Sequence, residues 1–347
     1  MVQRAWEVSA PAPLGRVAPA EGGPDAKGPL RLVERPEPEP GPGEVRVRVS
    51  VCGVCRTDLH VAEGDLPPHR PRVVPGHEVV GTVDRLGPGC KRFQLGQRVG
   101  AAWLAKSCGR CRFCTTEREN LCLAPTFRGW DIDGGYAEYV TGDEDFLYAL
   151  PDSFDDRSAA PLLCAGIIGY RALKRACLPP GGRLGLYGFG GSAHLVAQLA
   201  IAQGATVHVM TRSAKDQALA RQLGAASVND AFGTPPELLD SAVLFAPVGT
   251  LVPVALKALD RGGTLAVAGI HLTDVPVLNY DEHLFQERTL RSVTANTRRD
   301  GEEFLAAAAH FAIKATTTPY PFEAADQALW DLANDGFNGA AVITVAS

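Results

Sequence analysis

Residues 183–202, RLGLYGFGGSAHLVAQLAIA, constrain the fold more than any other part of this chain. A short apolar run meets a glycine turn and passes directly into an apolar helical pattern. Further apolar runs, typical of strands, cover residues 206–212, 241–247 and 264–270, and helical patterns cover residues 192–204, 215–225 and 251–263. Strands that alternate with helices predict a parallel, doubly wound sheet with helices on both faces. The chain is therefore expected to contain an α/β domain.

The glycine turn has the composition of a phosphate-binding loop. Gly188 and Gly190 keep the first two glycines of the dinucleotide fingerprint, and Ala193 takes the third position. Such a turn is weak evidence alone, but it is strong evidence between a strand and a helix. Its N–H groups and the helix N-terminus are expected to face a cofactor pyrophosphate. The candidate phosphate-binding residues are Gly188, Gly190, Gly191 and Ser192.

The end of the second strand of this domain predicts which cofactor binds. Sites that prefer NAD normally carry Asp or Glu there, to bind the ribose 2′-OH. This chain has Thr211 at that position and Arg212 next to it, a pair that suits a 2′-phosphate. We therefore favour NADP(H), with Ser213 and Lys215 as weaker phosphate contacts. NAD(H) remains the alternative, because Arg212 can instead stack on adenine or point to solvent.

Composition limits the classes of function that the chain can have. Its 347 residues are enough for two domains, and 46% of them are hydrophobic. The net charge is −5 without a basic stripe, which disfavours nucleic-acid binding. No apolar run reaches the roughly 20 residues that span a bilayer. The N-terminus, MVQRAWEVSAPAP, lacks the apolar core of a signal peptide, so we expect a cytoplasmic protein without membrane partners.

Four cysteines are clustered in residues 108–122, CGRCRFCTTERENLC. In a reducing compartment such a cluster indicates metal binding rather than disulfides. Cys108, Cys111, Cys114 and Cys122 suit one tetrahedral structural zinc. An iron–sulfur cluster is disfavoured, because the usual ferredoxin run has a shorter last gap and a proline after the fourth cysteine. Unmetallated thiols are the remaining alternative.

A second set of metal-ligating residues is spread over three segments. Cys55 lies in CGVCRTDLH, His77 in PGHEVVG and Cys164 in APLLCAGIIGY. Alone, a cysteine in an apolar segment is usually a small buried hydrophobe. Together the three side chains offer two thiolates and one imidazole, and three protein ligands plus an exchangeable water are typical of a catalytic zinc.

Five motifs in a fixed order point to one family. They are GVCRTDLH, PGHEVVGTVDRLGPG, the four-cysteine segment, DGGYAEYV and LLCAGIIGYRAL. With them the chain resembles the zinc-dependent alcohol dehydrogenases of the medium-chain dehydrogenase/reductase superfamily over nearly its whole length. The resemblance selects Cys55 rather than Cys52 as the ligand. It implies a mostly β, GroES-like catalytic domain at residues 1–165, completed by residues 299–347, and a Rossmann-type cofactor domain at residues 166–298.

The resemblance also implies roles for residues beside the ligands. Glu78 corresponds to a glutamate behind the zinc that approaches it during ligand exchange. Asp58 corresponds to the carboxylate that orients the ligand histidine, a support that metal sites generally need. Thr57 corresponds to the hydroxyl that touches the substrate oxygen, and His60 to the end of a proton relay through the cofactor ribose.

Four further residues are expected to contact cofactor or substrate by the same resemblance. Arg298 corresponds to an arginine that meets the pyrophosphate, and Arg56 lies where the family often has a phosphate-binding base. Trp103 corresponds to a residue of the substrate pocket, and Trp130 is expected to close its other side. Residues 10–28 are longer and richer in Gly, Pro and Ala than the usual family N-terminus, and their function is unassigned.

The expected activity is hydride transfer between NADP(H) and a primary alcohol or aldehyde, aromatic ones included. Two zincs per chain and a homodimer or homotetramer are implied. An NAD-dependent alcohol or polyol dehydrogenase is the alternative within the superfamily. A zinc-free quinone or enone reductase would lack the second ligand set. A non-catalytic zinc-ribbon module would leave the glycine turn unexplained.

Overall fold

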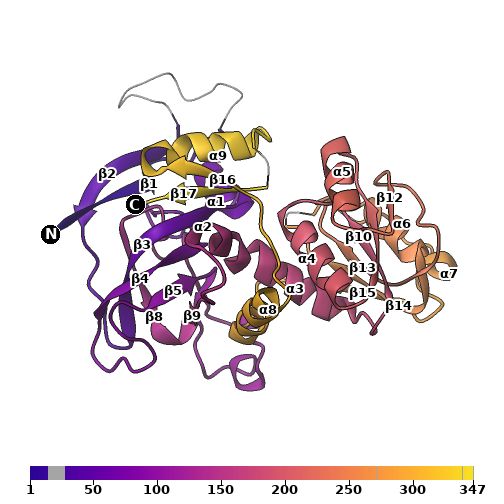
Figure 1. Ribbon diagram of the computed structural model, residues 1–347, viewed down its shortest axis with the longest axis horizontal. Helices are drawn as coiled ribbons and strands as arrows, with labels where there is room; N and C mark the ends of the chain where they lie inside the picture. The colour runs from indigo at the N-terminus through magenta and orange to yellow at the C-terminus, as the bar shows by residue number, and fades with distance from the viewer. Residues whose placement is uncertain (15–27, 271, 338, 347) are drawn as a thin grey trace. The chain divides into compact units, whose positions relative to one another are not determined.

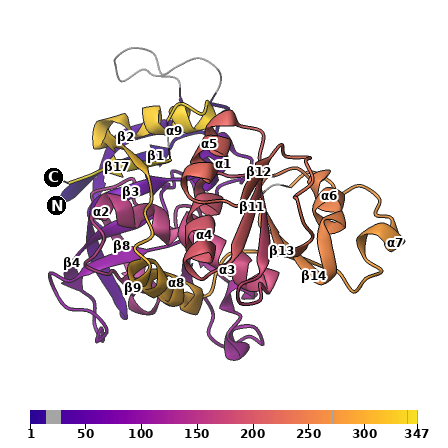
Figure 2. The same cartoon turned by 45° about the vertical axis from the view of Figure 1, so that its right-hand side comes forward.

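The computed structural model describes residues 1–14, 28–270, 272–337 and 339–346 (Figures 1 and 2). The chain forms two compact units. The first comprises Met1–Cys164, Thr297–Leu305 and Lys314–Ser347, and the second comprises Ala165–Asn296 and Ala306–Ile313. Most of the Gly/Pro/Ala-rich stretch of residues 10–28 lies outside the described residues.

The first unit is built mainly from β-strands. A seven-stranded sheet has the order β16 (Thr317–Pro321), β17 (Ala340–Thr344), β3 (Glu44–Val54), β4 (Val79–Leu86), β5 (Arg98–Ala101) and β9 (Leu147–Ala149), with β8 (Tyr139–Asp143) paired to β3. Two small sheets pair β1 (Val2–Val8) with β2 (Leu30–Pro36) and β6 (Leu104–Lys106) with β7 (Thr126–Phe127). The helices are α1 (Arg56–Glu63), α2 (Asp156–Ala159), α9 (Ala325–Ala333) and the start of α8 (Arg298–His310).

Short 3₁₀ turns connect these elements. They are η1 (Cys114–Thr116), η2 (Glu119–Leu121), η3 (Glu144–Phe146), η4 (Ala160–Leu163) and η5 (Phe322–Ala324).

Strand β3 organises the core of the first unit. In EVRVRVSVCGV the valines at 45, 47 and 49 are buried and Arg48 is exposed, as the alternation of a strand predicts. Arg46 departs from this alternation, because it is buried and pairs with Glu37 and Asp84. The strand pairs with β4, β8 and β17. It ends at Val54, so that Cys55 emerges directly from the most heavily paired strand of the sheet.

The second unit has the predicted parallel sheet. Its order is β12 (Ser227–Asn229), β11 (Thr206–Met210), β10 (Arg183–Tyr187), β13 (Leu239–Leu244), β14 (Leu259–Val267) and β15 (Thr289–Ser292), and all neighbours are parallel. The helices are α3 (Ala165–Ala176), α4 (Gly191–Ala202), α5 (Ala214–Gln222), α6 (Leu251–Lys257) and α7 (Tyr280–His283). This is the Rossmann-type α/β arrangement that the sequence pattern predicts. Among the described residues, no helix combines the length and the apolar character needed to cross a membrane.

One helix is shorter than the sequence predicts. The helical pattern of residues 251–263 is wrong beyond Lys257, because strand β14 already begins at Leu259. Leu259 pairs with Leu239 of β13. Gly262 has a φ of +71°, which an α-helix does not accommodate. Sheet pairing therefore takes over part of a segment that has helical periodicity.

Candidate active site

Three side chains from separate elements of the first unit come together. Cys55 precedes α1, His77 precedes β4 and Cys164 follows η4. The sulfurs of Cys55 and Cys164 lie 3.8 Å apart, and His77 Nε2 lies 3.2 Å from Cys164 Sγ. With a carboxylate oxygen of Glu78, the candidate ligand atoms all lie within 4.8 Å of one another. The structure thus brings together the four residues that the sequence assigned to this site.

Asp58 holds two of these residues in place. Its Oδ2 accepts a 2.9 Å hydrogen bond from the backbone N–H of Cys55. Its Oδ1 accepts bonds from the backbone N–H of Gly76, at 3.0 Å, and from Nδ1 of His77, at 2.9 Å. The carboxylate is buried, so these bonds are not weakened by water. Because Nδ1 donates its proton to Asp58, Nε2 is left with the lone pair that a metal ligand needs.

The electrostatics set Cys55 apart from the other candidate ligands, because its pKa is lowered whereas the pKa values of His77, Glu78 and Cys164 are raised. The contact with Cys164 lowers the pKa of the Cys55 thiol well below its usual value, against the effect of burial. Burial acts to lower the pKa of His77, but the charge and hydrogen bond of Asp58 outweigh it and raise that pKa. Burial, reinforced by the charge on Cys55, raises the pKa of Glu78.

Glu78 is buried and lies close to the other three residues. Its Oε2 has no hydrogen-bond partner among the described residues. A Cβ on Gly53 would lie 1.8 Å from that oxygen, so a glycine there leaves room for the glutamate. Burial of a carboxylate oxygen without a hydrogen-bond partner costs folding free energy. A cation bound nearby would offset that cost.

The donor set fits zinc. A tetrahedral zinc with Zn–S bonds of about 2.3 Å holds two sulfurs about 3.8 Å apart. The separation of the Cys55 and Cys164 sulfurs has this value. Two thiolates and one imidazole are also the softer ligands that zinc accepts, and they leave one coordination position for another molecule.

The four-cysteine segment, called the cysteine lobe below (residues 108–122), forms the other cluster of candidate ligands. The sulfur of Cys114 lies 3.9 Å from that of Cys108 and 3.5 Å from that of Cys111, and Cys111 and Cys122 are 4.0 Å apart. Hydrogen bonds from the backbone N–H groups of Cys114 and Leu123 lower the pKa of Cys111 to about 6. These distances suit a closed tetrahedral zinc site with four thiolates.

Three aromatic rings stack beside the ligands. Trp103 meets His77 edge to face at 5.2 Å and stacks on Phe127 at 4.9 Å. Trp130 stacks on Trp103 at 6.0 Å and on Phe127 at 5.9 Å. All three rings are partly exposed. Both tryptophans were predicted from the sequence, but Phe127 was not, although it belongs to the same FRGW segment as Trp130.

The remaining residues assigned by resemblance have definite partners. Thr57 is buried, with Oγ1 3.9 Å from Cys55 Sγ. His60 Nδ1 lies 3.2 Å from Oδ2 of Asp65, which follows the end of α1. Arg56 is half exposed and lies 3.4 Å from Asp335. Thr57 is therefore the one of these residues that is next to a candidate ligand.

In the second unit, the glycine turn follows β10 and opens α4. Gly188 has a φ of +87°, and a Cβ there would lie 2.9 Å from the backbone nitrogen of Ala246, so glycine is required. Gly190 is the N-cap of α4, and no side chain of the described residues caps that helix end by a hydrogen bond. An uncapped helix N-terminus of this kind suits a phosphate.

The end of β11 has the residues that the cofactor prediction requires. Thr211 is buried and its backbone N–H donates to Asn229 O, at 3.0 Å. Arg212 is exposed. Ser213 caps α5 by accepting a hydrogen bond from the N–H of Asp216, at 3.2 Å, so its hydroxyl already has a structural use.

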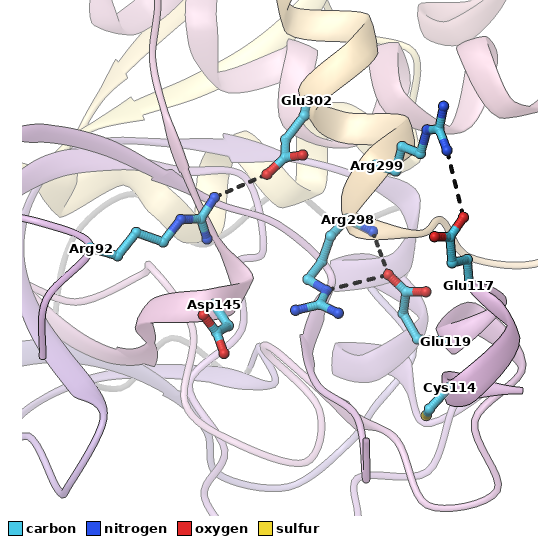
Figure 3. A pocket seen from close by; sticks show the side chains of 8 residues that line it. All are labelled: Arg92, Cys114, Glu117, Glu119, Asp145, Arg298, Arg299 and Glu302. Atoms are coloured by element: carbon cyan, nitrogen blue, oxygen red, sulfur yellow. Dashed lines mark hydrogen bonds and ion pairs between the residues drawn. The ribbon is translucent and has the colours of Figure 1, made fainter. Parts of the chain in front are cut away.

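Arg298 begins α8 and is held by the cysteine lobe. Its backbone N–H and its Nε both donate to Glu119 Oε1, at 3.0 and 3.3 Å (Figure 3). Arg299 forms an ion pair of 3.5 Å with Glu117. These charges border a cavity of about 340 Å³ lined by Arg92, Cys114, Glu117, Glu119, Asp145, Arg298, Arg299 and Glu302. This cavity shares no residue with the Cys55–His77–Cys164 set.

Gly134 is expected to be essential to the segment that carries His77. A Cβ at this position would lie 2.1 Å from the carbonyl oxygen of Gly76 and 2.6 Å from that of Pro75. Since backbone must move to admit it, Gly134→Ala should destabilise the protein by about 3 kcal/mol and lower its metal content. Urea unfolding and elemental analysis measure both. Gly28→Ala, where the added Cβ meets nothing within 4 Å, should change neither; equal stability of the two variants would contradict the prediction.

Comparison with known proteins agrees with this geometry. The family described as alcohol dehydrogenase GroES-like domain matches residues 41–152, and that described as zinc-binding dehydrogenase matches residues 191–310. A probable alcohol dehydrogenase of Mycobacterium tuberculosis is 56% identical over 98% of this chain and 97% of its own. A cinnamyl alcohol dehydrogenase of Sorghum bicolor has a TM-score of 0.87 at 26% identity, over 99% of this chain and 98% of its own. The cobalt- and zinc-bound thermostable alcohol dehydrogenase of Pyrobaculum aerophilum has a TM-score of 0.85 at 26% identity, over 99% and 100%.

Both family matches define an oxidoreductase with a GroES-like and a Rossmann-type part. Within that class, the chain belongs to the zinc-dependent alcohol dehydrogenases of the medium-chain dehydrogenase/reductase superfamily. The prediction from the five sequence motifs is thereby confirmed.

Proposed function

We propose that the protein interconverts primary alcohols and aldehydes, aromatic ones included, with NADP(H) as hydride carrier. The observation that carries this proposal is the convergence of Cys55, His77 and Cys164, oriented by Asp58, in a geometry that suits zinc. In the proposal these three residues hold the catalytic ion and Glu78 approaches it during ligand exchange. The catalytic domain is then proposed to comprise residues 1–165 with 299–347, which include most of the first unit, and residues 166–298 are proposed to bind the cofactor.

The chain's own side chains have distinct tasks in this reaction. When bound, zinc supplies Lewis acidity that stabilises negative charge on an alcohol oxygen or polarises a carbonyl. Asp58 fixes the ring of His77 and the backbone of Cys55, so the ligands are oriented in advance. The hydroxyl of Thr57, next to Cys55, takes the substrate proton and passes it toward solvent, with His60 as its last acceptor.

The proposed preference for NADP(H) depends on the residues after β11. A buried hydroxyl at Thr211 replaces the carboxylate of NAD sites, and the exposed guanidinium of Arg212 adds a positive charge. One charge-assisted hydrogen bond to a 2′-phosphate is worth about ten- to a hundredfold in affinity. Gly188, Gly190, Gly191 and Ser192 are proposed to receive the pyrophosphate, and Arg56 and Arg298 to add charge to it.

The cysteine lobe is proposed to hold a second, structural zinc. Its four thiolates leave no open coordination position, so this ion contributes stability rather than chemistry. The Pyrobaculum enzyme, whose structure contains cobalt and zinc, supports metal binding within the same fold.

The stacked rings support an aromatic substrate. Trp103 and Trp130 lie with an angle of 11° between their planes, beside the ligand His77. Flat, partly exposed rings bind planar substrates well, because offset stacking adds to burial of apolar area. The Sorghum neighbour, named as a cinnamyl alcohol dehydrogenase, agrees with this substrate class.

A homodimer or homotetramer is proposed from apolar side chains of the second unit. Val277 is 98% exposed, Tyr280 62% and Phe285 56%. The rings of Tyr280 and Phe285 meet edge to face with centroids 5.7 Å apart, and exposed apolar side chains that gather in this way are typical of a protein interface. Val277→Glu is expected to shift the protein toward monomer in light scattering after size exclusion. Leu95→Glu, at a leucine 64% exposed in the other unit, is the control and should leave the assembly unchanged. A wild type that is monomeric at micromolar concentration would contradict the proposal.

The test of the function is the initial rate of NADPH and NADH oxidation with aliphatic and aromatic aldehydes, using protein of measured zinc content. Turnover that prefers NADPH and requires zinc supports the proposal. Turnover that prefers NADH leaves the dehydrogenase in place and contradicts the cofactor assignment. Preference for polyols over primary alcohols in the reverse direction would contradict the substrate class.

A further inference from the structure

Trp130 is held by a segment far from it in sequence. Its indole Nε1 donates a 2.8 Å hydrogen bond to the carbonyl of Pro67. The ring of His69 lies against the indole, with 3.9 Å between ring centroids and 32° between planes. Two residues of one loop therefore fix both the edge and the face of this tryptophan.

His69 is fixed in turn by Asp131. The Nδ1 of the histidine lies 2.5 Å from Asp131 Oδ1. The other oxygen of the same carboxylate accepts a 2.7 Å hydrogen bond from the backbone N–H of Phe127. One carboxylate thus connects the histidine that covers Trp130 with the backbone of the ring that stacks on Trp103.

Hydrogen bonds that do not involve His69 hold the backbone of residues 127–133, the segment that carries Phe127 and Trp130. Arg128, between Phe127 and Trp130, is fully buried and donates from Nη1 to the carbonyls of Thr141, at 3.0 Å, and Asp133, at 3.3 Å. The N–H of Gly129 donates to Ile132 O, at 2.8 Å. The backbone of residues 127–133 therefore keeps its shape without His69, and what His69 adds is the orientation of the Trp130 ring.

Stability of the fold does not account for this arrangement. The side chain of His69 is 56% exposed, and ion pairs at such positions contribute little to folding. The surface that His69 and Asp131 organise adjoins the metal-ligand set, because Trp103 contacts both Trp130 and His77. A side chain held in one rotamer loses less entropy when a ligand stacks on it.

We infer that His69 and Asp131 are positioning residues, which hold Trp130 and Phe127 parallel to Trp103 and so make the flat surface that selects aromatic over short aliphatic substrates. This inference rests on the proposed function, and it concerns the choice of substrate rather than the reaction. Neither residue touches the reacting atoms. Their effect is exerted through the orientation of the rings.

The experiment compares benzaldehyde with propanal in His69→Leu and Asp131→Asn. The KM for benzaldehyde is expected to rise about tenfold, because loss of one aromatic stacking contact weakens binding by about that factor. The KM for propanal and both kcat values should stay within about twofold, since the ligands and Thr57 are untouched. His69→Phe keeps a ring against Trp130 and should recover most of the benzaldehyde KM. Arg70→Gln, a neighbouring charge that pairs with Asp133 at 3.7 Å, is the matched control.

Near-ultraviolet circular dichroism of the tryptophan bands adds a readout that does not depend on turnover. His69→Leu should change these bands, and Arg70→Gln should not. A wild type that prefers benzaldehyde, with variants that keep the same ratio of KM values, would overturn the inference while the proposed function stands. A wild type that treats both aldehydes alike contradicts the aromatic substrate class, and unchanged tryptophan bands in His69→Leu would then overturn the positioning role as well.

Discussion

Replacing Cys164 with serine is expected to reduce kcat/KM at least about a thousandfold, because loss of the ion removes several kcal/mol of charge stabilisation. The sulfur of Cys164 is within 3.8 Å of Cys55 Sγ and 3.2 Å of His77 Nε2, so it belongs to the centre of the ligand set. The zinc content should fall from two to one per chain, as measured by mass spectrometry of the metal. Cys111→Ser should also remove one zinc, but it should act mainly on stability.

The control for both variants is Cys177→Ser. Cys177 is exposed and belongs to neither cluster of candidate ligands. Its replacement should leave the zinc content and turnover unchanged. Full activity of Cys164→Ser with one zinc remaining would contradict the assignment of the catalytic site. Two zincs retained in Cys111→Ser would contradict the assignment of the cysteine lobe.

The second large effect is expected at the cofactor ribose. Arg212→Ala should lower kcat/KM for NADPH about ten- to a hundredfold, because one charge-assisted contact to the 2′-phosphate is lost. The double replacement Thr211→Asp with Arg212→Ala should in addition raise the use of NADH, since a carboxylate accepts hydrogen bonds from the ribose hydroxyls and repels the phosphate. Fluorescence titration of both cofactors separates binding from turnover.

Arg221→Ala is the matched control, since Arg221 is an exposed arginine in the last turn of α5, the helix that follows Arg212 in the chain. It should change affinity for neither cofactor. If Arg212→Ala binds NADPH as tightly as the wild type, Arg212 does not contact the phosphate, and the preference for NADP(H) loses its main support.

Local patterns were enough to predict most of the fold. The periodicity of the strands and helices predicted the parallel sheet of the second unit. The glycine turn marked the crossover from β10 through α4 to β11. Residues 259–263 were assigned wrongly to a helix, since Leu259 pairs with Leu239 of β13, outside the local window, and the register shifts before the next pair, Thr264 with Ser241. Periodicity within a window does not contain that information.

The candidate site could be predicted where it consists of residue types, such as clustered cysteines, that have few roles other than metal binding. Cysteines and a histidine in known motifs identified both clusters of candidate ligands. His69 and Asp131 were missed because a histidine in a proline-rich loop and an aspartate in a turn are ordinary in sequence. Their pairing joins residues 62 positions apart and is visible only in three dimensions.

The hydrogen-bond partner of Arg298 also could not be predicted from the sequence. Its sequence context suggested a contact with phosphate, but the partner that the structure provides is Glu119, 179 positions away. A carboxylate that accepts from both the backbone and the side chain of an arginine fixes its direction. The proposed phosphate contact therefore depends on a residue of the cysteine lobe.

That dependence bears on how the chain tolerates shortening. Relatives or engineered versions that trim residues 108–122 to a simple loop would also delete the acceptor of the first residue of α8. Thr297 and Asp300 would still cap that helix, because the backbone N–H of each donates to the side chain of the other, but the N–H of Arg298 would lose its acceptor. The cysteine lobe is therefore not an independent insertion. Removing it, or transferring it to another protein, changes the hydrogen bonding at the start of α8, which lies far from it in sequence.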